Sequence, residues 1–167
     1  MTLWDWSVAA YAAEGVADAC LDLQDHHEQN TCLLLWAGWN AATARRPDEE
    51  TVEAACDVAR AWDSTTISPL RAVRRTLKLP VPDIEDAARE AVRSRIKAVE
   101  LEAERQLLLA LEPLSPAPSG GPCPTIDALV ETTRVWTRVI PRPALIRLAE
   151  RLPAGPSLGY KYGGADT

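Results

Sequence analysis

Residues 30–39 read NTCLLLWAGW, and this stretch decides the fold. Asn30 can cap a helix through its side-chain oxygen, and the run that follows it is apolar on every side of that helix. The charge-free stretch 32–44 is too short to span a membrane, and Gly38 and Asn40 interrupt it. We therefore expect a buried helix at the centre of a helical domain.

Before this central helix, two apolar stripes with helical spacing predict two short helices. Gly15 separates them and is expected to end the first. The stripe of the first helix is Trp4, Val8 and Tyr11. The stripe of the second helix is Val16, Cys20 and Leu23.

After the central helix, start signals predict three more helices. Pro47 and Asp48 open one, and Ser68 is expected to cap the next because Pro69 suits a first helical position. Asp83 is expected to open the longest helix. A single apolar stripe follows that helix for nearly five turns: Val92, Ile96, Val99, Ala103, Leu107 and Ala110. No segment alternates as a strand does, so the prediction is an all-α, bundle-like domain of about six helices.

Composition divides the chain into four parts. Residues 1–112 form the predicted helical domain, and residues 113–124 (PLSPAPSGGPCP) are typical of an extended linker. Residues 125–152 are expected to form a C-terminal helical hairpin, either docked on the domain or semi-independent. Residues 153–167 are rich in Gly and Pro and are predicted to be a disordered tail.

Charge is unevenly distributed along the chain, whose net charge is −6. Residues 1–30 carry six acids and no Lys or Arg, whereas residues 67–97 carry eight bases against four acids. The overall sign disfavours general nucleic-acid binding, although a local anion site stays open.

The segment MTLWDW has no basic region followed by an apolar run, which predicts no secretory signal. The four cysteines form no CxxC pair and no zinc spacing. We expect a reduced, cytoplasmic protein that does not enter a membrane.

The sharpest candidate site is a basic stripe, whose spacing places four cations on one helix face. Its members are Arg71, Arg74, Arg75 and Lys78. One interpretation is that they pair with acids of residues 48–63 or face water. The other is that they contact an acidic protein or an anionic ligand, because Arg suits bidentate recognition of carboxylate and phosphate.

A second candidate lies in the N-terminal segment, which holds four of the six tryptophans with a group of polar residues. Core packing is expected for most of the tryptophans, but Trp6 lies off the Trp4 stripe, and an exposed Trp6 would suit a partner's groove. The polar residues either cap helices or line a pocket: Asp5, Gln24, Asp25 and Asn30.

Other chemistry has little support. Asp22 and His26 share a helix face, but no third or fourth metal ligand accompanies them, so no metal is predicted. No catalytic residue, phosphate loop or cofactor motif is assigned. Glu100 and Glu104 are one turn apart, which leaves acid–base chemistry by carboxylates open.

Three blocks of the sequence resemble an uncharacterised, mainly proteobacterial family of small helical proteins. They are LWDW with the later LQD, Asn30 and LLL; then PLR, RR and LK of residues 69–78; and ELEAER of residues 100–105. The resemblance covers roughly residues 3–112. It implies a helical fold and a bacterial cytoplasmic setting, and no activity.

The expected function is a non-enzymatic interaction or adaptor module with a protein partner, whose contact surface combines the basic stripe with the C-terminal hairpin. The alternative is a helical protein that binds a small molecule or anion, including an enzyme, in a polar pocket near the N-terminal block.

Overall fold

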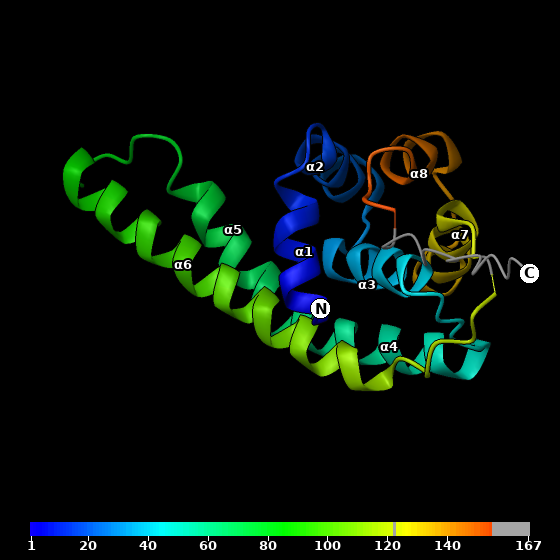
Figure 1. Cartoon of the computed structure of the whole chain (residues 1–167). Coiled ribbons are helices and arrows are strands. Elements are labelled where there is room, and N and C mark those ends of the chain that lie inside the picture. The colour runs from blue at the N-terminus through cyan, green and yellow to red at the C-terminus, as the bar shows by residue number, and fades with distance from the viewer. Residues whose placement is uncertain (122, 155–167) are drawn as a thin grey trace, which may run out of the picture.

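The computed structural model describes residues 1–121 and 123–154, and all regular structure in them is helical (Figure 1). The all-α prediction is therefore confirmed. The elements in chain order are α1 (Leu3–Tyr11), α2 (Val16–His27), α3 (Thr31–Ala42), α4 (Glu49–Trp62), the π-helical η1 (Asp63–Ile67), α5 (Ser68–Thr76), α6 (Asp86–Leu111), the 3-10 turn η2 (Glu112–Leu114), α7 (Thr125–Trp136) and α8 (Arg142–Ala149).

Helix α3 is the centre of the molecule, as its apolar run predicts. Asn30 caps it, since the Asn30 Oδ1 accepts a hydrogen bond from the Leu33 amide at 3.1 Å. Every residue from Cys32 to Ala41 is buried, and α1, α2, α4, α6 and α7 all pack against the helix. One hydrophobic core results, with Trp36 fully buried inside it.

Helix α1 buries a different face from the one predicted. Its buried residues are Leu3, Trp6, Ser7 and Ala10, whereas Val8 and Tyr11 of the expected stripe are exposed. Both stripes have helical spacing. The choice between them depends on α3, where the missing side chain of Gly38 leaves room for the Trp6 ring; a Cβ there would lie 3.1 Å from it.

Helices α4 and α5 form one continuous rod through η1, so Ser68 does not cap a new helix as predicted. The Ser68 amide donates to the carbonyl of Asp63, five residues back, and the Ser68 hydroxyl donates to the Asp63 carboxylate at 2.9 Å. Pro69 has no amide hydrogen to donate. The wider π turn just before it is how the helix continues.

Helix α6 begins at Asp86 rather than at Asp83, whose φ of 64° is left-handed and incompatible with a helix start. Its first half lies beside α5, and the two helices project from the rest of the molecule (Figure 1). We call α5, the following loop and residues 86–99 the arm. No residue of α5 is buried, and burial on α6 begins at Glu100. Of the predicted stripe, Val92 and Val99 are therefore exposed.

Helices α7 and α8 lie at the opposite end of the molecule from the arm (Figure 1). Helix α7 packs against α3 and α4, and α8 packs against α2 and α7. Leu129, Leu145 and Leu148 are fully buried in the same core as α3. The C-terminal hairpin thus completes the enclosure of the central helix.

Ser115 and Pro116, which come after η2, lie against the C-terminal half of α3 and the loop after it. The Trp36 Nε1 donates to the Ser115 hydroxyl at 2.8 Å, and the Arg45 guanidinium donates to the Pro116 carbonyl at 2.7 Å. Of the predicted tail, residues 155–167 lie outside the described residues. Within the described ranges, no helix combines the length and apolar character that a membrane crossing needs.

Candidate functional site

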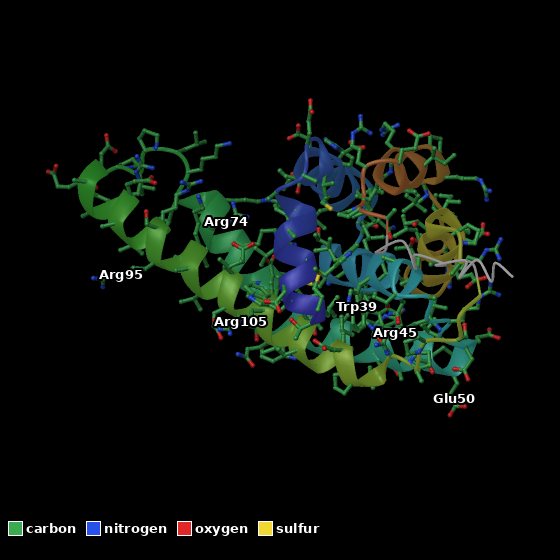
Figure 2. All side chains as sticks on the ribbon, in the orientation of Figure 1. Trp39, Arg45, Glu50, Arg74, Arg95 and Arg105 are labelled. Carbon is green, nitrogen blue, oxygen red and sulfur yellow. The ribbon has the colours of Figure 1, made fainter. Side chains whose placement is uncertain are left out.

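Two of the four cations of the basic stripe, Arg71 and Arg74, point into the molecule. Arg71 and Arg74 both bind the carboxylate of Glu100, with Arg71 Nε at 3.2 Å and Arg74 Nε at 2.5 Å. Glu100 is only 6% exposed, so this is a buried, charge-assisted cluster. Figure 2 shows Arg74 at the junction of α5 and α6. The acids that pair with the stripe are therefore not those of residues 48–63, as one interpretation expected.

The other two cations of the stripe are exposed. Arg75 forms an ion pair with Asp25 of α2 at 2.6 Å, and no ion pair of Lys78 is found among the described residues. The stripe thus joins the arm to the rest of the molecule, and only its outer end faces solvent. The C-terminal hairpin is on the other side, so the two do not form one combined surface (Figure 1).

The polar N-terminal residues are dispersed. Asp5 accepts a hydrogen bond from Thr2 at the start of α1, Asn30 caps α3, and Asp25 binds Arg75. Gln24 donates to Asp25 at 3.2 Å and lines a groove that none of the other three reaches. The structure does not bring these four side chains into one pocket.

Trp6 is not available to a partner, because it is 5% exposed and lies against Gly38. Its ring fills the gap between α1 and α3. The condition for a Trp6 contact, an exposed ring, is not met.

A groove lies between α1, α3 and α6. Of the predicted site residues, Gln24 is the one that lines it. Its volume is about 520 Å³, and its walls are mainly apolar. We call it the α1–α6 groove. Its lining residues are Trp4, Ser7, Val8, Tyr11, Ala12, Gln24, Thr31, Cys32, Leu35, Leu101, Glu104 and Leu108. The stripe expected in the core forms one wall of it: Val8 and Tyr11 are exposed, and Trp4 is partly buried.

Glu104 is the charged group of this groove. Its carboxylate lies 3.6 Å from Arg71 Nη2, but Arg71 also binds Glu100. Burial and the neighbouring Glu100 raise the pKa of Glu104, although Arg71 and Arg74 act in the opposite direction. The sequence places Glu100 and Glu104 one turn apart, but the cations that pair with them come from α5 and are identified only by its packing on α6.

Tyr11 lines the same groove, and its pKa is also raised. Burial, with smaller contributions from Cys20, Glu104 and Cys32, raises the pKa of Tyr11 to about 12. The phenol therefore stays protonated near neutral pH. Burial also raises the pKa of Cys32 well above its usual range, so this thiol lines the groove as a small apolar group.

Comparison with known families places these features. A family model described as a protein of unknown function (DUF2390) matches residues 2–111. The chain belongs to this family. Membership of a family of unknown function, expected from the resemblance, is thereby confirmed. No curated protein and no solved structure matches the chain.

The DUF2390 region ends with α6, so it contains the arm, the Arg71–Glu100 cluster and the α1–α6 groove, but not α7 or α8. The arm and the groove consequently belong to the part of the chain that the family model covers. The hairpin that covers α3 lies beyond it.

Asp22 and the histidines form a surface network in α2. Asp22 accepts from His26 at 3.0 Å and from Arg147 of α8 at 2.9 Å, and these hydrogen bonds lower the pKa of Asp22. A search of the described residues finds no group of three His, Cys, Asp or Glu arranged to hold a metal. This network ties α8 to α2.

A second hollow of about 260 Å³ lies between α3, α4 and α7. Asn40 is buried there, and its Oδ1 has no hydrogen-bond partner. Asp127 and Glu131 of α7 also line it. This hollow straddles the end of the DUF2390 match, and its lining is more polar than that of the α1–α6 groove.

The arm of this DUF2390 chain carries an uncovered apolar face. Val92 is 52% exposed and Val99 is 53% exposed. Arg95 shares their side of α6, and Figure 2 shows it pointing away from α5. We call this surface the open face of α6; its residues are Ala88, Ala91, Val92, Arg95, Ala98 and Val99, all exposed.

Proposed function

We propose that this chain is a non-enzymatic interaction module of the bacterial cytoplasm, and that the open face of α6 is where a protein partner docks. The observation that supports this is a largely apolar helix face, from Ala88 to Val99, that is left uncovered on a projecting arm. Helices with such a stripe normally bury it against another element.

The partner's chemistry follows from the residues around the open face. Val92 and Val99 call for an apolar contact at the centre of the interface. Arg95, exposed on the same side of α6 as Val92 and Val99, favours an acidic group on the partner. The partner is therefore a protein with an apolar groove or helix that carries Asp or Glu opposite Arg95.

The proposed contact surface differs from the one expected from the sequence, which includes the basic stripe of Arg71, Arg74, Arg75 and Lys78. Arg71 and Arg74 hold Glu100, so reversing their charge would disturb the arm's attachment as well as its surface. Arg75 and Lys78 remain exposed at the side of the arm.

The proposal is tested by co-purification of the tagged full chain from its native cell, followed by binding of the identified partner to the purified chain. We expect Val92→Glu with Val99→Glu to raise the dissociation constant tenfold or more, which corresponds to a loss of about 1.4 kcal/mol of binding free energy. Each added charge would be buried unpaired in the interface.

The matched control is Val139→Glu, since Val139 is also an exposed valine but lies between α7 and α8. The control should leave the affinity unchanged. Equal affinities for wild type and the Val92 and Val99 double variant would contradict the proposed surface.

A further inference from the structure

The α1–α6 groove has the form of a ligand site. Leu35 and Leu108 belong to its buried floor, and Trp4 and Tyr11 supply aromatic walls. Its volume of about 520 Å³ falls within the usual range for pockets that take small molecules. Residues of four helices, α1, α2, α3 and α6, line it, so its shape is set by the packing of the core.

A buried hydroxyl in the groove has no partner. Ser7 is 3% exposed, lines the groove, and its Oγ makes no hydrogen bond. Buried side-chain oxygens in folded proteins nearly always have a partner. An occupant with a polar atom would satisfy it.

Of the remaining polar groups of the groove, the Glu104 carboxylate carries acceptors alone, whereas Tyr11, Thr31 and Gln24 can both donate and accept. The carboxylate therefore calls for a ligand group that donates hydrogen bonds.

The charges favour a cation. Among the described residues no Lys or Arg lines the groove, and Arg71, which pairs with Glu104, also pairs with Glu100. Arg74 is a second cation near Glu104, but it binds Glu100, and Arg105 lies over the Trp4 ring at 5.3 Å and pairs with Glu102.

We propose that the α1–α6 groove binds a small amphiphilic amine, with its apolar body between Trp4, Tyr11 and Leu108 and its ammonium group at Glu104. An ammonium supplies three donors to the Glu104 carboxylate, whose own cation, Arg71, is shared with Glu100. The same carboxylate repels an anion. This site is separate from the open face of α6 and does not depend on the function proposed for it.

The test measures binding of 2-phenylethylamine to the full chain by protein-observed NMR. Two matched probes accompany it: 2-phenylethanol, which keeps the ring and loses the charge, and 3-phenylpropanoate, which carries a negative charge. We expect the amine to shift signals of α1, α3 and α6, the alcohol to bind more weakly, and the carboxylate not to bind.

Glu104→Gln should weaken the affinity for the amine about tenfold or more. The substitution removes a charge-assisted hydrogen bond while the shape of the side chain stays nearly unchanged. The matched control is Glu102→Gln on the same helix, whose side chain binds Gln106 at the surface. A second control is Glu131→Gln in the hollow between α3, α4 and α7. Both controls should bind the amine as wild type does.

A second variant keeps the test independent of Glu104. Val8→Arg places a cation on the rim of the groove and should abolish amine binding, while Leu21→Arg, an equally exposed apolar position outside the groove, should not. The proposal is overturned if the carboxylate binds as well as the amine, or if the amine gives no shifts. It is also overturned if Glu131→Gln removes binding that Glu104→Gln keeps. A dimer in sedimentation, together with no binding of the amine by NMR, would overturn it as well.

Discussion

Two carboxylates one helical turn apart meet very different surroundings in α6. Glu100 receives the guanidinium groups of both Arg71 and Arg74, and the hydrogen bond with Glu100 raises the pKa of Arg74. Glu104 shares Arg71 and faces an apolar groove, so its own pKa is raised. The first carboxylate attaches the arm, and the second is a charge held in a place that disfavours it.

This difference predicts how Glu104→Gln changes stability with pH. The pKa of Glu104 is higher in the folded than in the unfolded chain, so the folded state holds that proton more tightly. Between the two pKa values, its contribution to the free energy of unfolding falls as pH rises. The groups facing Glu104 are Glu100 on its own helix, Arg71 and Arg74 of α5, Tyr11 of α1 and Cys32 of α3.

Urea unfolding of wild type and Glu104→Gln across acid to neutral pH measures this effect. The variant should gain stability relative to wild type as pH rises through the folded pKa of Glu104, and the gain should then level off. Glu102→Gln, which changes an exposed carboxylate, should show no such trend. A constant or falling difference for Glu104→Gln would contradict the assignment.

At the scale of elements, α7 and α8 are part of the core that surrounds α3. Leu129 and Leu145 are fully buried, and the Trp136 indole donates to the Glu28 carbonyl at 2.8 Å. The Arg60 guanidinium of α4 donates to the Val135 carbonyl at 2.7 Å. The hairpin is therefore held by both apolar packing and hydrogen bonds.

Adjacent residues of α8 test this role. Leu145→Ala should lower the free energy of unfolding by about 3 kcal/mol, because it removes a fully buried side chain and leaves a cavity. Ile146→Ala, one residue away and partly exposed, should change it by less than about 1 kcal/mol. Chemical denaturation of the full chain measures both. Equal, small effects would mean that α8 does not contribute to the core.

Local signals predicted the elements well and their neighbours less well. Asn30 and Asp48 cap their helices as expected, and the apolar run after Asn30 is the buried centre. Periodicity alone could not choose between the Trp6 and Val8 faces of α1, because the choice depends on Gly38, far along the chain. Periodicity also cannot say whether the partner of Val92 belongs to the same chain.

The candidate sites show the same limit. The spacing of Arg71 and Arg74 correctly placed them on one face, but the acid that answers them, Glu100, is fixed by the packing of α5 on α6. The groove is lined by residues from four helices, and no motif within one segment marks it.

The whole molecule divides into a well-packed body and an arm with little burial. The core contains residues from α1 to α8, yet none of α5 and none of residues 86–99 is buried. Backbone groups with few buried neighbours open at a low free energy. The body and the arm should therefore differ in local stability.

Native-state hydrogen exchange measures this difference. Amides of α3 should exchange only through global unfolding, whereas those of α5 and of residues 86–99 should exchange faster by a factor of about 100 or more. Bound partner should slow exchange in residues 86–99 and leave α7 unchanged. Equal protection of α5 and α3 in the isolated chain would contradict this division.

The projecting arm also makes the molecule an electric dipole. Residues 86–99 extend about 20 Å as a helix. The arm holds the local excess of eight bases over four acids in residues 67–97, while the chain as a whole carries −6. In the field of an acidic surface the molecule would rotate so that the arm arrives first. This orientation acts over a Debye length of about 8 Å at physiological ionic strength, so added salt should slow association more than dissociation.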